Sequence, residues 1–299
     1  MGSVELKAHK AYGASLKLAK TPTEAKDEAI KKIAEKIREN KQKIVEANQR
    51  DVAQAEGELS PALLARLKLD SGKIDSIVES IESVGRLSDP AGETLSATEL
   101  DSNLILYKVS VPIGVIGAVF ESRPNVVCEI SSLCLKSGNS VLLKGGSEAA
   151  NSNKILYELI RDASVEAGAP DGWIQLLESR QEVKDMLSCD KYISLLVPRG
   201  SNEFVKYIKE NTRIPVLGHA SGICHVYVHD KADLSMASEI VYDAKCQYPA
   251  VCNALETLLV DGRNASDFLP SMAGRLFEAN VVLRGDEVAA SLVEGLEVA

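Results

Sequence analysis

The first part of the chain repeats apolar residues at the spacing of an α-helix. The segment 25–37, AKDEAIKKIAEKI, places its apolar residues on one stripe, with lysines and glutamates between them. Similar stripes at 8–19, 44–53 and 74–87 predict further helices, and Ser60-Pro61 is typical of a helix start. The N-terminal region is therefore predicted to be helical, with its charged faces turned to water.

Beyond residue 100 the spacing becomes that of β-strands. Residues 103–110, NLILYKVS, alternate as a strand does, while 111–120, VPIGVIGAVF, and 140–144, SVLLK, are nearly continuous apolar runs. Such runs are typical of parallel strands that are covered on both faces. Shorter strands are expected at 173–177 and 192–197. Helical segments and glycine turns separate the strands, so the fold class is α/β with a doubly wound parallel sheet.

The order of the elements predicts two domains. Residues 1–212 would contain the N-terminal helices and a nucleotide-binding sheet, with a strand arm at about 103–111. Residues 213–299 would form part of a second α/β domain. Its expected elements are strands at 215–217, 224–228 and 281–283, a helix at 268–279, and an acidic, helix-prone tail at 284–299.

The composition is that of an ordinary soluble protein, with 45% hydrophobic residues among 299. A net charge of −9 makes the surface as a whole repel nucleic acid and anionic membranes, so an anionic ligand needs a local positive site. No apolar stretch approaches the roughly 20 residues of a membrane helix. The six cysteines form no C-x-x-C pair and the four histidines no metal spacing. We therefore expect reduced thiols, a cytoplasmic location and no metal site.

Two glycine turns follow predicted parallel strands and open helices. They are Lys144-Gly145-Gly146-Ser147 and Arg199-Gly200-Ser201. Backbone N–H groups at a helix N-terminus suit a phosphate, and Lys144 adds a positive charge. Neither turn matches the P-loop or G-x-G-x-x-G, so each alone could be an ordinary turn. Because both lie at the carboxyl edge of the sheet, together they favour a dinucleotide site.

A third polar turn, Ser122-Arg123-Pro124-Asn125, lies at the same edge. Asn125 could donate to an oxyanion, or it could simply cap the helix that follows. Cys252, within QYPAVCNALETLLV, lies where a loop meets a regular element, and free backbone N–H groups there would lower the pKa of a thiol. The alternative for Cys252 is a buried structural cysteine. His219 and His225 flank Gly222 and could contact a phosphate or only a backbone group.

Five segments, in this order and spacing, resemble the glutamate-5-semialdehyde dehydrogenases. They are VPIGVIGAVFESRPNV, SGNSVLLKGGSEA, PRGSNEF, LGHASGICHVYVHDKADLS and QYPAVCNALETLLV. These enzymes, also called γ-glutamyl phosphate reductases, are a branch of the aldehyde dehydrogenase superfamily. The resemblance runs to at least Leu283. Because members of the family continue further, it implies an aldehyde-dehydrogenase-like fold with an incomplete catalytic domain.

The resemblance also implies roles for individual residues. Cys252 matches the catalytic thiol, and Asn125 falls at the oxyanion asparagine. Lys144 and Ser147, with the two glycines between them, fall in the turn that holds the adenosine ribose and its 2′-phosphate. Gly200 and Ser201, after Arg199, fall near the pyrophosphate. Candidates for contact with the substrate or its phosphate are Arg123, His219 and Asn253.

The implied reaction is the reduction of γ-glutamyl phosphate by NADPH to glutamate-5-semialdehyde and phosphate, through a thioester on Cys252, in proline synthesis. It implies a functional link to glutamate 5-kinase and, for complete members, a homo-oligomer. Val216 occupies the place where hydrolytic aldehyde dehydrogenases carry a glutamate base. Two alternatives stay open: a hydrolytic aldehyde dehydrogenase, and a truncated nucleotide-binding or subunit-interaction remnant of the fold.

Overall fold

The computed structural model describes residues 2–218, 222–249, 251 and 253–299. The chain divides into two compact units, Met1–His219 and Ala220–Ala299. The first unit ends a few residues after the predicted boundary at 212. Among the described residues, no helix has the length and apolar character needed to cross a membrane.

The predicted N-terminal helices are present in the first unit. They are α1 (Ser3–Leu18), α2 (Thr23–Glu39), α3 (Lys41–Ala55), α4 (Pro61–Leu67) and α5 (Ser71–Gly85). The apolar stripe of α2 is buried, with Ile30, Ile33 and Ile37 at most 1% exposed. The α5 helix begins where the Asp70 side chain accepts a hydrogen bond from the Lys73 N–H.

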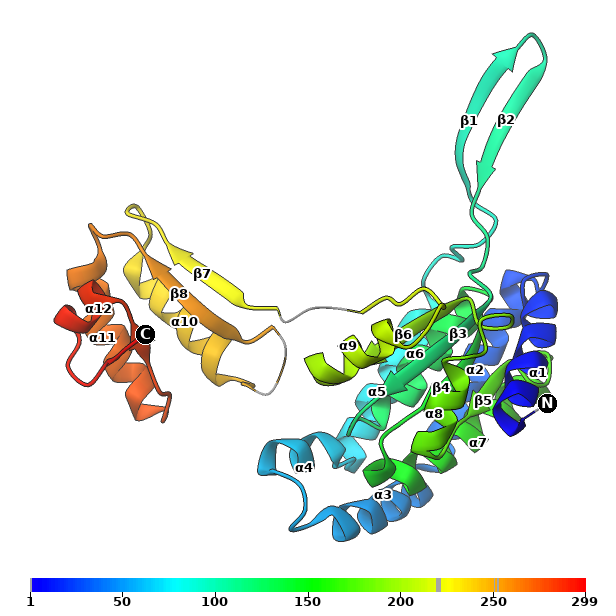
Figure 1. The fold of residues 1–299 in the computed structure, drawn as a ribbon, viewed down its shortest axis with the longest axis horizontal. Helices are drawn as coiled ribbons and strands as arrows, with labels where there is room; N and C mark the ends of the chain where they lie inside the picture. Colours follow the sequence, from blue (N-terminus) through cyan, green and yellow to red (C-terminus); the bar gives the residue numbers. More distant parts are fainter. Residues whose placement is uncertain (1, 219–221, 250, 252) are drawn as a thin grey trace. The chain divides into compact units, whose positions relative to one another are not determined.

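A four-stranded parallel sheet forms the centre of this unit, in the order β5-β4-β3-β6 (Figure 1). The strands and the helices between them are β3 (Val115–Phe120), α6 (Asn125–Lys136), β4 (Ser140–Lys144), α7 (Ala150–Glu166), β5 (Ile174–Leu176), α8 (Arg180–Met186), β6 (Leu195–Arg199) and α9 (Asn202–Glu210). A short 3-10 turn, η1 (Ser147–Ala149), precedes α7. Every residue of β3 and β4 is buried, as their continuous apolar runs predict.

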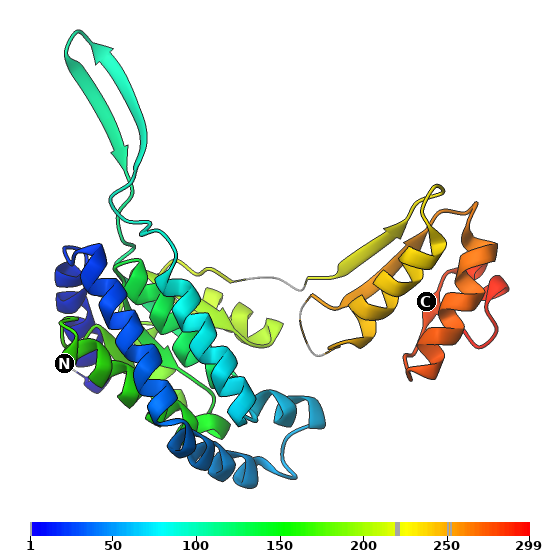
Figure 2. The same cartoon turned by 180° about the vertical axis from the view of Figure 1, so that it is seen from behind.

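Alternate side chains of the sheet enter two separate cores. Ala118 and Phe120 of β3 pack with α2, α5, α6 and α7, whereas Val115 and Val119 pack with α1, α8 and α9. Figure 2 shows the N-terminal helices α2 and α5, in blue and cyan, in front of the sheet. Helices therefore cover both faces, which confirms the predicted doubly wound α/β fold.

The predicted strand at 103–110 is one half of an antiparallel hairpin. It consists of β1 (Thr94–Asp101) and β2 (Leu104–Val109), joined at Asn103, whose φ is 65°. Every residue of both strands is exposed within this chain. The β1 strand was not predicted, because its residues, TLSATELD, do not form an apolar face.

The second unit is built on two parallel strands, β7 (Cys224–Val228) and β8 (Leu255–Val260). Its other elements are α10 (Leu234–Cys246), α11 (Ala265–Glu278), β9 (Arg284–Gly285), α12 (Glu287–Leu292) and β10 (Glu297–Val298). Three predictions are corrected here. Val216 makes only an isolated bridge to Leu196, no strand covers 281–283, and the tail is only partly helical. The α10 helix was not predicted, although Asp233 caps it by accepting from Ser235 and Met236 N–H groups.

Candidate cofactor and active site

Three loops meet at the carboxyl edge of the first sheet because of the strand register. Val119 of β3 pairs with Lys144 at the end of β4, and Phe120 pairs with Arg199 at the end of β6. The chain leaves β3 for β4 on one side and later returns to β6 on the other side. The gap between β3 and β6 is thus a topological switch point, where open α/β sheets bind their ligands.

The turn after β4 carries a buried positive charge. Lys144 is 6% exposed, and its Nζ donates to the Gly145 carbonyl. Burial lowers the pKa of Lys144, while the nearby Glu148 carboxylate acts in the opposite direction. A Cβ on Gly145 would lie 2.2 Å from Asn153 Nδ2, so this position has no room for a side chain. Ser147 follows and is exposed.

A carboxylate joins this turn to the loop after β3. Glu148 Oε1 accepts from both the backbone N–H and the Oγ of Ser122, each at 2.6 Å. Burial alone would raise the pKa of Glu148, but the Ser122 donors and Lys144 hold it below its usual value. Glu148 therefore stays ionised at neutral pH, between Ser122 and a lysine.

A second carboxylate covers the N-terminus of α7. Asp51 of α3 is 1% exposed and accepts four hydrogen bonds: from Asn151 N at 3.0 Å and Nδ2 at 2.8 Å, and from Ser152 N at 2.8 Å and Oγ at 2.6 Å. It satisfies N–H groups of the first helical turn and matches the positive end of the helix dipole. The N–H groups of Asn151 and Ser152 at this helix N-terminus, where a phosphate was expected, are thus bonded to the protein's own carboxylate.

The loop after β6 lies against the loop after β3. A Cβ on Gly200 would lie 3.0 Å from Glu121 Cδ and 3.1 Å from Phe204 Cδ1, so Gly200 allows a close approach. Ser201 caps α9, its Oγ accepting from the Phe204 N–H at 3.3 Å. Arg199 is exposed at the end of β6. The two predicted glycine turns and the loop between them thus form one continuous edge.

Asn125 is the first residue of α6 and not its cap. The cap position is Pro124, and no side chain caps this helix. Asn125 Nδ2 donates to Glu129 Oε1 at 2.8 Å, one turn along the helix. An amide carries two N–H donors, and Glu129 orients the group through one of them. Arg123, half-buried, lies in the same loop.

A comparison with models of protein families identifies the family of this chain. The model of the aldehyde dehydrogenase family matches residues 3–288. The chain belongs to the aldehyde dehydrogenase family. The resemblance inferred from the five segments is thereby confirmed at the level of the family.

Curated relatives indicate which branch of the aldehyde dehydrogenase family the chain is most similar to among those compared. The chain is 54% identical over 297 residues to a γ-glutamyl phosphate reductase of Natronomonas pharaonis, covering 98% of this chain and 67% of the relative. It is 54% identical over 282 residues to the enzyme of the same name from Ruminiclostridium cellulolyticum, covering 94% and 65%. The crystal structure of γ-glutamyl phosphate reductase from Thermotoga maritima matches with a TM-score of 0.92 and 38% identity, over 100% of this chain and 73% of that one. The chain spans about two thirds of the length of these curated relatives.

The catalytic thiol expected of an aldehyde dehydrogenase, Cys252, lies outside the described residues, as does His219. Asn253 is exposed in the turn before β8. His225 has its Nδ1 2.7 Å from the Ile223 carbonyl, which fits the backbone-contact interpretation. Cys134 is a structural cysteine, since it is 4% exposed and packs in the core, and this burial raises the pKa of its thiol.

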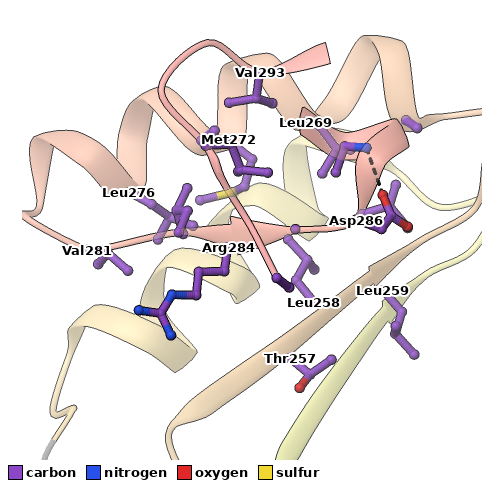
Figure 3. A pocket seen from close by; sticks show the side chains of 18 of the residues that line it. Thr257, Leu258, Leu259, Leu269, Met272, Leu276, Val281, Arg284, Asp286 and Val293 are labelled. Atoms are coloured by element: carbon purple, nitrogen blue, oxygen red, sulfur yellow. Dashed lines mark hydrogen bonds between the residues drawn. The ribbon is translucent and has the colours of Figure 1, made fainter. Parts of the chain in front are cut away.

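The second unit contains an apolar cavity of about 1030 Å³ between β8, α11 and the tail. Figure 3 shows Leu258 on the cavity side with Met272 and Leu276, and Thr257 and Leu259 on the other side of β8. Its wall is mainly aliphatic, and its Arg284 pairs with Glu297 at 3.0 Å. This wall offers packing surface and not an arrangement for acid–base chemistry. No group of three or more potential metal ligands occurs among the described residues.

The carboxylates that shape the first unit's edge, Glu148 and Asp51, could not be predicted from the sequence pattern. Glu148 lies next to the predicted turn, but its partner Ser122 is 26 positions away. Asp51 is about 100 positions from its partners. The only available signal was an acidic residue within an otherwise regular helix, which most often marks a solvated face.

Proposed function

We propose that this chain carries the cofactor domain and the thiol of a γ-glutamyl phosphate reductase. The reaction is the NADPH-dependent reduction of L-γ-glutamyl 5-phosphate to L-glutamate 5-semialdehyde and phosphate, a step of proline synthesis. The observation that carries the proposal is the 54% identity to enzymes of that name over nearly the whole chain. The substrate is an acyl phosphate, so a kinase acting on the γ-carboxyl of glutamate must supply it.

The carboxyl edge of the first sheet fits a nicotinamide dinucleotide. The Lys144–Ser147 turn has a buried ammonium and two glycines that let the neighbouring side chains pack closely against it, and the Arg199–Ser201 turn lies across the switch point. We assign the first turn to the adenosine ribose and the second to the pyrophosphate. An exposed serine at position 147 beside Lys144 suits a 2′-phosphate, which favours NADP over NAD.

Two residues, Cys252 and Asn125, carry the proposed chemistry. The Cys252 thiolate attacks the acyl carbon, forming a thioester as the C–O bond to phosphate breaks. When bound, the cofactor supplies the hydride that reduces this thioester. Asn125, oriented by Glu129, donates to the oxyanion of the resulting tetrahedral thiohemiacetal, which collapses to the aldehyde and returns the thiolate. Val216, an apolar residue at the place of the hydrolytic base, cannot activate water, and this disfavours the hydrolytic alternative.

The test is phosphate-dependent reduction of NADP⁺ by glutamate-5-semialdehyde, with Cys252→Ala and Cys252→Ser beside the parent chain. Both variants should lose at least about 100-fold in rate, because a hydroxyl is a poorer nucleophile than a thiolate and an ester a poorer hydride acceptor. The matched control is Cys246→Ser, because Cys246 is a half-buried thiol of the same unit. This variant should keep parental turnover. Near-parental rates in Cys252→Ser would exclude the thioester route. NADPH binding without turnover in the parent would support the nucleotide-binding remnant instead.

A further inference from the structure

The backbone at Ser122 is held in a conformation that a serine rarely adopts. Its φ is 42°, in the left-handed region, although it has a side chain and is 4% exposed. Such a conformation is unfavourable for a residue with a side chain and persists only where surrounding contacts determine it. The contacts here are the two 2.6 Å hydrogen bonds from Ser122 N and Oγ to one oxygen of Glu148.

Gly146 provides the space for this arrangement. A Cβ at that position would lie 2.0 Å from Glu148 Oε1 and 2.4 Å from Cδ. The carboxylate therefore folds back over the glycine to reach the neighbouring loop. The absence of a side chain at Gly146 is therefore needed even without a bound phosphate, because it leaves space for the Glu148 side chain.

We propose that Glu148 is a positioning residue, whose carboxylate fixes the loop that carries Arg123 and leads to Asn125 at the start of α6 against the turn carrying Lys144. This inference rests on the proposed function, since it assigns the two loops to the oxyanion donor and the cofactor. One oxygen atom connects them, through a backbone N–H and a hydroxyl. A movement of the Lys144–Ser147 turn therefore reaches Ser122 through Glu148, and Asn125 lies three positions after Ser122 in the chain.

The two possible roles of Glu148, a purely electrostatic one and a positioning one, predict opposite changes in NADPH affinity when its carboxylate is removed. A carboxylate near Lys144 weakens the attraction for an anionic cofactor, so a Glu148 that acted only through its charge would oppose NADPH binding. Removing it would then tighten binding. If Glu148 positions the loops, removing it loosens them, and NADPH binds more weakly. The sign of the change in affinity therefore separates the two roles.

The experiment compares Glu148→Ala, Glu148→Gln, Ser122→Ala and the double alanine variant in the full 299-residue chain. NADPH affinity is measured by nicotinamide fluorescence, and hydrogen exchange is followed in the peptide covering 120–126. Glu166→Gln is the control, because it removes an exposed carboxylate at the far end of α7, the helix that follows η1. We expect Glu148→Ala to weaken NADPH binding about tenfold and Ser122→Ala to weaken it less. Glu148→Gln keeps an acceptor and should be intermediate.

The double variant tests whether the two residues act through one contact. If they do, it binds NADPH no more weakly than Glu148→Ala, and the single effects are not additive. Exchange at 120–126 should rise in Glu148→Ala and stay parental in Glu166→Gln. Tighter NADPH binding in Glu148→Ala, or additive losses in the double variant, would overturn the proposal. If the parent chain bound no NADPH, the proposed function would fail, and the exchange comparison alone would decide: unchanged exchange in Glu148→Ala would overturn the positioning role.

Discussion

Replacing Asp51 with alanine removes the acceptor for four hydrogen bonds in one step. Asp51 lies on α3, and its partners Asn151 and Ser152 lie in the first turn of α7, shortly after the proposed cofactor turn. The contact therefore joins the N-terminal helices to the helix that supports the site. The substitution is small, and the hydrogen bonds that it removes hold α3 against α7, so its main effect is on the stability of the first unit.

The loss of stability in Asp51→Ala depends on which of the four hydrogen-bond donors can be hydrated once the carboxylate is removed. Ser152 is 0% exposed, so its N–H and hydroxyl lose their acceptor inside the protein, at about 1–3 kcal/mol each. Asn151 is half-buried and can be partly rehydrated. The loss of a carboxylate at the α7 N-terminus adds roughly 0.3–2 kcal/mol. We expect Asp51→Ala to lower the free energy of unfolding by about 3–5 kcal/mol, a large part of the 5–15 kcal/mol of a typical domain. Asp51→Asn, which keeps one acceptor oxygen, should lose about half as much.

The chain contains its own reporter for this unit. Trp173 is the only tryptophan, is 0% exposed and donates to Ser164 Oγ at 2.9 Å. Its fluorescence during urea denaturation follows the first unit alone, which avoids treating two units as one transition. Asp75→Ala is the matched control, because Asp75 is 55% exposed in its pair with Lys41 and should contribute less than about 1 kcal/mol. If Asp51→Ala destabilised no more than this control, the reasoning from buried donors would be wrong.

The same fluorescence assay tests two further expectations. Gly145→Ala should destabilise the first unit by about 1–3 kcal/mol and weaken NADPH binding, because its Cβ would lie 2.2 Å from Asn153. Gly13→Ala, in an exposed part of α1 with nothing within 4 Å, should instead stabilise it by about 0.5–1 kcal/mol; equal effects would contradict the role of space at Gly145. Burial alone would raise the pKa of Glu182, but backbone N–H donors and the Lys7 ammonium lower it from 4.5 to about 2. Its stabilisation is therefore present above pH 4.5 and is lost as pH falls toward 2, and Glu182→Gln should show a smaller loss of stability between pH 7 and pH 3 than the parent.

The sequence predicted the parts of the fold whose signal is local. SVLLK at 140–144 is a strand within its predicted bounds, because five consecutive buried residues in a short run leave little alternative. The α2 helix likewise follows from its apolar stripe. The β1 strand and α10 were missed for the reverse reason. The residues of β1 have no buried face, and α10 buries only Ala237 and Val241, so periodicity carries little information.

The edge of the sheet was predictable, but its internal contacts were not. Parallel strands must end at the same edge, so the turns at Lys144 and Gly200 could be placed together from the order of the elements. The bonds from Ser122 to Glu148 depend on which rotamer a glutamate adopts and on a positive φ at a serine, and neither leaves a mark in the sequence. Such local departures from preferred geometry tend to occur at functional sites.

These contacts also restrict how the edge can hold the negative charge of a dinucleotide. Asp51 already matches the α7 N-terminus, and Glu148 adds a carboxylate beside the turn, in a chain of net charge −9. The helix dipole therefore contributes less to anion binding than the sequence alone suggests, and the buried ammonium of Lys144 contributes more. Because burial lowers the pKa of Lys144, an arriving phosphate would favour its charged form. The charge on Lys144 and the bound cofactor then stabilise each other, while the Ser122–Glu148 contact keeps the carboxylate bonded to the neighbouring loop.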